Sequence, residues 1–560
     1  MRKVLLVLLV LFAIPALASD QPGFSAWIVD SLIKVFPDTT SQPAGNYGTI
    51  YCARNGHTSV QIAFRSASEQ RVTLKVVSPR RKKSSLSIKV YRVGYVEVKS
   101  HPKGTPPDEL VRPELGEYPD PLYPLNGEFA LHPERTESVW IEVFAASSAD
   151  PGFYEGSVEV RAGKKRIVLP IRVEVVQASI PKQQKLWVTN WLWLDHDMLD
   201  KHYPLIKSHP DLYWSVIANI AATMAEYRQN VAFVPVRSLA KAQLVNGNIR
   251  YDFQEVDRWV EIFDKVGLAR RIEGGHLSGR QGGGYDARYV LPTDLVEDGK
   301  IVQKELPADD PRAEANLRQF LRQLREHLKQ KGRLDRYFQH VHDEPHGSEM
   351  PIYKRFASIV REEMPGTPII DAISLKEDVG AVQQTTIWVP ELSTFDDQLG
   401  TMQKHSEQGG QNWYYICLGP TGRYLNRFVD YPLLKVRLLP WLNFRYGLTG
   451  YLHWGGNFWT DDPIHDLQPN WGGDTYLPAG DDAIVYPDAA HDGAFPSIRL
   501  AMMREGIEDY ELLSMAAESK PKEARALVNA VIPGFTDYVR DVVTFRRYQE
   551  ELLKLAAQVR

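Results

Sequence analysis

The densest group of ionisable side chains in the sequence is the heptapeptide His340-Val-His-Asp-Glu-Pro-His346, which contains the adjacent carboxylates Asp343 and Glu344. Hydrolysis of a glycosidic bond needs one carboxylic acid that protonates the leaving oxygen and a second group that manages the oxocarbenium-like centre. Two carboxylates in one short segment can supply both groups. We therefore take Asp343 and Glu344 as the candidate catalytic pair.

The adjacency of these two carboxylates restricts the mechanism. Neighbouring residues of a strand point to opposite faces, so Asp343 and Glu344 can share a pocket only if the strand has ended or bulged there. Even then they are poorly placed to flank a glycosidic bond from both sides, as the ordinary retaining geometry requires. The pattern instead favours substrate-assisted hydrolysis of a 2-acetamido sugar. Glu344 would be the general acid/base, and Asp343 would hold the substrate group that acts as nucleophile.

A metal site is the main alternative, because His340 and His342 have the His-x-His spacing of some metal-dependent hydrolases. Such sites need further histidines at later strand ends, and the runs 368–373 and 386–389 contain none. Three histidines in one heptapeptide make a poor zinc shell. We therefore expect no metal and no other cofactor. A glycan-binding protein that has lost turnover on the same scaffold is the other alternative.

The segments around the pair predict how it is positioned. From about 59 to 177, short stretches alternate apolar and polar residues between turns, which predicts an all-β sandwich. Afterwards short apolar runs alternate with amphipathic helices, which predicts a (β/α)₈ TIM barrel with its active site at the strand C-termini. An open doubly wound sheet is the rival, but no Gly-x-Gly-x-x-Gly follows the first strand. The eight runs are 186–191, 231–236, 269–273, 337–342, 368–373, 386–389, 413–417 and 450–454.

The chain should divide into a signal peptide at 1–18, an N-terminal β-sandwich at 19–180, the catalytic barrel at 181–520 and a C-terminal helical extension at 521–560. The signal consists of Met1-Arg2-Lys3, an apolar run at 4–13 and a small-residue site ending at Ala18. This pattern predicts a secreted or periplasmic protein with no integral membrane segment after cleavage. We expect long loops at 282–310 and 460–495.

The composition agrees with a glycan as the partner. Among 560 residues there are only two cysteines, Cys52 and Cys417, so the fold cannot depend on a disulfide framework. A net charge of −4 disfavours nucleic acid as a partner. The sequence contains 13 Trp and 26 Tyr, whose rings can stack on sugars. Candidate substrate contacts near the strand ends are His276, His342, Trp388, Tyr415, Trp454, Asn457 and Trp459.

Four segments together resemble glycoside hydrolase family 123: Asp343-Glu344, the motif Gly-Tyr-Leu-His-Trp-Gly-Gly-Asn-Phe-Trp at 450–459, the stretch 496–513 and the upstream stretch 150–160. The resemblance spans nearly the whole mature chain. It implies an enzyme that removes terminal β-linked N-acetylgalactosamine, or a related β-N-acetylhexosamine, through an oxazolinium intermediate. It also implies that Asp343 orients the acetamido nitrogen and that Glu344 is the acid/base.

The stretch 496–513 is the most specific part of the resemblance, but we do not expect it to be catalytic. We expect its charged residues to form structural ion pairs that close the barrel. They are Arg504, Glu505, Glu508 and Asp509.

Overall fold

The computed structural model describes residues 23–40, 49–82, 84–284, 287–375, 385–472 and 475–558. The expected signal peptide at 1–18 lies outside these residues. Within the described part of the chain, none of the helices combines the length and apolar character needed to cross a bilayer.

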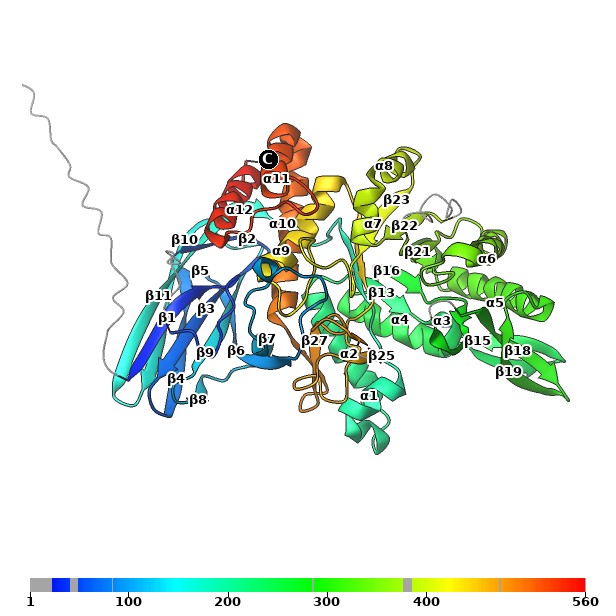
Figure 1. The fold of residues 1–560 in the computed structure, drawn as a ribbon, viewed down its shortest axis with the longest axis horizontal. Helices are drawn as coiled ribbons and strands as arrows, with labels where there is room; N and C mark the ends of the chain where they lie inside the picture. The colour runs from blue at the N-terminus through cyan, green and yellow to red at the C-terminus, as the bar shows by residue number, and fades with distance from the viewer. Residues whose placement is uncertain are drawn as a thin grey trace, which may run out of the picture.

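The N-terminal part consists of two β-sheets, drawn in blue and cyan in Figure 1. Alternate side chains from both sheets, among them Ile62, Val139, Val158 and Val173, meet in one buried core. All described strand pairs here are antiparallel except β2 with β11. The first sheet contains β1 (Phe24–Asp30), β3 (Gly56–Ser66), β9 (Thr136–Ala145), β6 (Ser87–Val98) and β7 (Gly116–Pro124). The second contains β2 (Thr49–Arg54), β11 (Lys165–Ser179), β10 (Gly152–Ala162), β4 (Gln70–Arg81), β5 (Ser84–Ser85) and β8 (Glu128–Leu131).

The middle of the chain forms parallel strands, one overlapping each of the eight predicted runs. They form a three-stranded sheet and a five-stranded sheet. A parallel bridge between Gln339 and Ile369 joins the two sheets on one side. On the other side the N–H of Asn230 donates to the carbonyl of Val188 at 3.3 Å. The first sheet is β13 (Val231–Val234), β16 (Arg271–Gly274) and β20 (Tyr337–Gln339). The second is β12 (Trp187–Asn190), β24 (Gly450–His453), β23 (Gln411–Tyr415), β22 (Ile387–Pro390) and β21 (Ile370–Ile373).

Helices separate these strands and follow the last of them, and several are amphipathic, as the sequence predicts. In α5 the residues Leu317, Phe320, Leu321 and Leu324 are buried on one face. The helices are α1 (His196–His202), α2 (Leu212–Glu226), α3 (Val236–Leu239), α4 (Gln254–Val266), α5 (Pro311–Gln330), α6 (Met350–Glu363), α7 (Leu392–Asp397), α8 (Leu399–Glu407), α9 (Leu433–Tyr446) and α10 (Ile498–Ser519).

The prediction of long loops at 282–310 and 460–495 is wrong in part, because both segments contain antiparallel strands. In 282–310, strands β18 (Tyr289–Glu297) and β19 (Lys300–Pro307) turn at Asp298-Gly299, and both turn residues have positive φ. Asp-Gly is a strong hairpin turn signal, and it accounts for the hairpin in place of a loop. This hairpin projects at the right of Figure 1. The other inserted strands are β14 (Lys241–Val245), β15 (Asn248–Asp252), β17 (Gly279–Arg280), β25 (Asn470–Gly472), β26 (Thr475–Tyr476), β27 (Val485–Asp488) and β28 (Gly493–Pro496).

Two of the three C-terminal helices, α10 and α12 (Val542–Ala556), contact the N-terminal sheets and connect the two parts of the molecule. Helix α10 is buried along most of its length, and α11 (Pro521–Val531) and α12 pack against it. The charges of α10 form structural ion pairs, as we expected, although some of them join α10 to the N-terminal sheets and do not close the barrel. Arg504 pairs with Glu142 of β9, and Glu505 and Asp509 both pair with Arg437 of α9. A buried charge is tolerated when it has such a partner.

Candidate active site

The catalytic pair lies in a turn directly after strand β20. The strand ends at Gln339, and Glu344 has a φ of +43°. This left-handed conformation is uncommon for residues other than glycine and needs support from its surroundings. The side chain of Arg280 provides support by donating to the carbonyl of Glu344 at 2.9 Å. The strand has therefore ended before the pair, which is the condition under which adjacent carboxylates can share a pocket.

Glu344 has the properties of a general acid. Burial, followed by the negative charge of Asp343, raises its pKa to about 7. Tyr415, the last residue of β23, donates a hydrogen bond from its hydroxyl to Oε1 of Glu344. A carboxyl group with a pKa near neutrality can give a proton and later take one back.

Asp343 occupies a different environment beside it. Its side chain is 51% exposed, and Nε2 of His276 lies 3.8 Å from its Oδ1. The surrounding protein raises the pKa of Asp343, while the positive charges of His340 and Arg280 lower it. Burial lowers the pKa of His276 well below its ordinary value, so this ring is neutral. The structure thus places His276, one of the predicted substrate contacts, next to Asp343.

A buried triad of charged residues lies next to the pair. Nε2 of His340 is 2.7 Å from Oε1 of Glu273, and its Nδ1 is 3.1 Å from Oδ1 of Asp371. All three side chains are fully buried. Sequence analysis missed Glu273 and Asp371. For Asp371 a signal was present, since it is a lone carboxylate in the apolar run 368–373, whereas Glu273 ends a run that also contains Arg270 and Arg271.

Among the described residues, His276, His340 and Asp371 form a group whose ligand atoms lie within 4.8 Å of one another. Both ring nitrogens of His340 already contact carboxylates, so we do not assign a metal there. The pair His340 and His342, considered above as metal ligands, does not converge on one point. Nδ1 of His342 lies 2.9 Å from the hydroxyl of Ser278, and its ring packs on Tyr289.

Comparison with known proteins decides the family. The family model described as "Glycoside hydrolase 123, catalytic domain" matches residues 196–516, which is more than half of the chain. The chain belongs to glycoside hydrolase family 123. A comparison with curated protein sequences gave no match.

Solved structures similar to this family 123 chain include a family 123 glycoside hydrolase from Clostridium perfringens, studied for glycolipid glycan hydrolysis. It is 15% identical, with a TM-score of 0.74, and the match covers 96% of this chain and 97% of that one. A family 10 xylanase with a bacterial Ig-like domain from termite gut is 11% identical, with a TM-score of 0.35 and coverage of 67% and 90%. The first of these likenesses shows the shared fold.

Membership of family 123 makes the protein a glycoside hydrolase that acts on carbohydrate. The matched segment 196–516 includes both Asp343 and Glu344. It also includes Trp454, whose indole N–H donates to Oδ2 of Asp481 at 3.2 Å. Trp454 is partly exposed and packs in the same cluster as Tyr415 and Trp191. We keep Trp454 and Tyr415 as candidate walls of the sugar pocket.

Three other predicted sugar contacts of this family 123 enzyme are engaged in the fold instead. Trp388 stacks on His405 of α8, on the opposite face of β22 from Ile387 and Val389. Asn457 is fully buried and exchanges two hydrogen bonds with the backbone of Trp193.

The third is Trp459, which is buried and donates to the carbonyl of Val485 at 2.7 Å. The sequence placed Trp388, Asn457 and Trp459 near strand ends but could not show which way each side chain faces.

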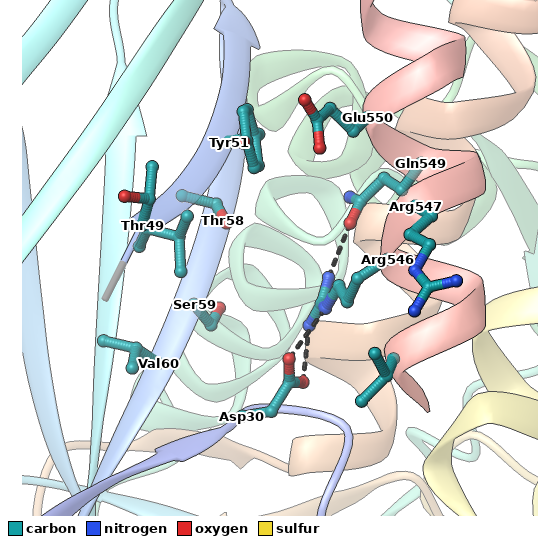
Figure 2. Close-up of a pocket in the computed structure, with 12 residues that line it drawn as sticks. Asp30, Thr49, Tyr51, Thr58, Ser59, Val60, Arg546, Arg547, Gln549 and Glu550 are labelled. Atoms are coloured by element: carbon teal, nitrogen blue, oxygen red, sulfur yellow. Dashed lines mark hydrogen bonds and ion pairs between the residues drawn. The ribbon is translucent and has the colours of Figure 1, made fainter. Parts of the chain in front are cut away.

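A cavity of about 330 Å³ lies away from the pair, between β2, β3 and helix α12. Figure 2 shows its lining. Arg546 of α12 binds the carboxylate of Asp30 through two nitrogens and the amide oxygen of Gln549 through a third. Ser59 donates to Glu505. Because these polar groups pair with one another, the cavity gives no indication of a ligand.

Proposed function

We propose that this glycoside hydrolase removes terminal β-linked N-acetylgalactosamine, or a related β-N-acetylhexosamine, by substrate-assisted retaining hydrolysis. The observation that carries the proposal is the turn at Glu344, whose positive φ follows the end of β20. Consecutive carboxylates can share a pocket only where the strand has ended in this way. Carboxylates on consecutive residues approach the sugar from one side, so the second face needs a nucleophile from the substrate itself.

In the first step Glu344 protonates the glycosidic oxygen while the carbonyl oxygen of the 2-acetamido group attacks the anomeric carbon. Asp343 accepts a hydrogen bond from the acetamido N–H, and its negative charge stabilises the developing oxazolinium ion. In the second step Glu344 removes a proton from water, and the water oxygen attacks the anomeric carbon. The bond from the anomeric carbon to the acetamido oxygen breaks, so the oxazolinium ring opens and the configuration is retained overall.

A third carboxylate, Glu391, is poorly suited to act as an enzyme nucleophile. Its Oε2 accepts hydrogen bonds from the backbone N–H groups of Ser393 and Thr394, and so caps the start of α7. This engagement of Glu391 supports a nucleophile supplied by the substrate. The partner would be a glycan or glycoconjugate, and a glycolipid headgroup is one class to test.

We also propose that the eight parallel strands close into a (β/α)₈ barrel behind an N-terminal β-sandwich. The neighbour order of the strands supports it: each lies beside the next in the chain and β12 pairs with β24. The domain bounds are those given above, at 180 and 520. Residues 1–18 would direct export to a periplasm or outside the cell.

The experiment that tests the function is a screen of 4-nitrophenyl glycosides that differ in anomer and in the C2 and C4 substituents. We expect cleavage of the β-linked 2-acetamido sugars, highest for the galacto configuration, and inhibition by a thiazoline analogue of the oxazoline. Equal rates on the 2-hydroxy sugars would contradict substrate assistance. Equal rates on both C4 epimers would contradict the preference for N-acetylgalactosamine. The proposed mechanism would stand, and the specificity would extend to both β-N-acetylhexosamines.

A further inference from the structure

The buried triad Glu273–His340–Asp371 takes no part in the bond-breaking steps above, yet it lies next to the catalytic turn. Its members come from adjacent strands: Glu273 from β16, His340 directly after β20 and Asp371 from β21. None of the three side chains is exposed to solvent. Burying three ionisable groups is costly unless their charges and hydrogen bonds are matched.

The donors around the two carboxylates fix the charge of His340. The indole N–H of Trp191 donates to Oε1 of Glu273 at 2.9 Å, and the hydroxyl of Tyr353 donates to Oδ2 of Asp371 at 2.8 Å. Oε2 of Glu273 also accepts from the hydroxyl of Thr189, and Oδ1 of Asp371 accepts from the backbone N–H of Val341. A carboxyl group whose two oxygens both accept hydrogen bonds is favoured in its ionised form. The ring nitrogen facing each of them must therefore carry a hydrogen, and a ring with two N–H groups is an imidazolium.

The triad also fixes the backbone that leads to the pair. Oδ1 of Asp371 accepts hydrogen bonds from the N–H of Val341 at 3.0 Å and from that of His342 at 3.3 Å. These two residues immediately precede Asp343. Because the left-handed turn at Glu344 is strained, its geometry depends on such contacts.

We propose that His340 is a positioning residue of this enzyme. Its buried imidazolium, held between Glu273 and Asp371, fixes the catalytic turn and keeps Asp343 ionised beside a protonated Glu344. This inference rests on the proposed catalytic roles of Asp343 and Glu344.

The other ionisable groups around the pair are consistent with an ionised Asp343 beside a protonated Glu344. Arg280 lowers the pKa of both Asp343 and Glu344, and Glu391 raises that of Glu344. Burial keeps His276 neutral, and burial lowers the pKa of His342 to about 3. The hydrogen bond from Tyr415 lowers the pKa of Glu344. Of these groups, only Arg280 and His340 bring positive charge to Asp343.

Two variants change the charge of the triad in opposite directions with little change in size. His340→Gln removes a positive charge, so it should raise the pKa of Asp343. The acidic limb of the kcat/KM profile with 4-nitrophenyl β-N-acetylgalactosaminide should move up by about one pH unit. Glu273→Gln removes a negative charge, so the same limb should move down. If the triad served packing alone, both variants would lower kcat or stability, and the acidic limb would not move in opposite directions.

A second measurement needs neither substrate nor variant. Contacts with Glu273 and Asp371 outweigh burial and raise the pKa of His340 to about 9. In ¹⁵N-histidine NMR, both ring nitrogens of His340 should therefore remain protonated at pH 8. A neutral His340 ring at pH 7 overturns the inference, even where a triad variant fails to fold.

The outcomes separate this inference from the proposed function. If Glu344→Gln is inactive and neither triad variant moves the acidic limb, the inference is wrong and the proposed function stands. If the wild type cleaves no 2-acetamido sugar, the proposed function fails. The inference about Asp343 and Glu344 then fails with it, and the NMR measurement still decides the charge of His340.

Discussion

The hydroxyl of Tyr415 donates a hydrogen bond to Oε1 of Glu344, although the two residues lie 71 positions apart in the sequence. Tyr415 ends β23, whereas Glu344 lies in the turn after β20, so the contact joins two strand ends that belong to different sheets. It orients the acid and favours its ionised form, since a hydrogen bond to a carboxylate stabilises the charge.

The pKa of Glu344 predicts the alkaline limb of activity. The acid must be protonated to donate to the glycosidic oxygen, so the rate falls as the pH rises through its pKa of about 7. We expect kcat/KM on 4-nitrophenyl β-N-acetylgalactosaminide to decline with a midpoint near pH 7. A flat profile up to pH 9 would contradict this assignment of the acid.

Replacement of Tyr415 by Phe should shift that limb. The variant loses a hydrogen bond that favours ionised Glu344, so the pKa of Glu344 rises and activity persists to higher pH. Poorer orientation of the acid should also lower kcat by about tenfold. Tyr414→Phe is the matched control, because the Tyr414 hydroxyl donates to the carbonyl of Leu439 on α9 instead.

Replacement of Glu344 by Gln should depend on the leaving group. An amide cannot protonate the glycosidic oxygen, so alkyl and sugar leaving groups should be cleaved about 10² to 10⁴ times more slowly. Dinitrophenolate needs little protonation, so dinitrophenyl glycosides should lose less in the first step. Glu362→Gln, which changes an exposed carboxylate paired with Arg318, should leave both rates unchanged. Wild-type rates in Glu344→Gln would refute the role of Glu344.

Replacement of Asp343 by Asn should weaken the transition state that forms the oxazolinium ion. The amide keeps the size of the side chain but removes the negative charge beside the acetamido N–H. We expect kcat to fall about 10²-fold, a typical effect of removing one stabilising group. Affinity for a neutral thiazoline should change less than affinity for its protonated form, which titration calorimetry at several pH values would measure.

Replacement of Arg504 by Ala should destabilise the fold rather than change catalysis. It leaves Glu142 buried and without its cationic partner, which costs about 3–5 kcal/mol of unfolding free energy. Arg71→Ala breaks an exposed pair with Glu128 and should cost about 1 kcal/mol or less. Urea unfolding of the two variants compares these values, and similar losses in both would contradict the structural role of Arg504.

The sequence predicted the eight parallel strands because each is a short apolar run bounded by helices. It predicted Asp343 and Glu344 as one site because a strand end exposes consecutive side chains. It missed Asp371, because the later runs were searched for histidine alone, and it missed Glu273, which ends an earlier run beside two arginines. A single charged residue in a buried strand is the stronger signal, since such a residue persists only with a partner.

The direction of aromatic side chains was the least predictable property. Trp388 and Tyr415 both belong to strands near the site, but Trp388 faces the helix α8 and Tyr415 faces Glu344. Strand alternation assigns such faces only once the register is known. No local pattern in the sequence fixes that register for strands of four or five residues.

The ion pair between Arg546 and Asp30 joins residues 516 positions apart in the sequence. Ribosomes release the chain from the N-terminus, so β1 is synthesised long before α12 exists. The contact between β1 and α12 therefore cannot form until the last helix has been synthesised. The chain must then close a very long loop to make it. We expect the N-terminal part to acquire its full resistance to protease only after synthesis of the C-terminal helices. A chain released before α12 would serve as a substrate for chaperones and proteases rather than as an enzyme.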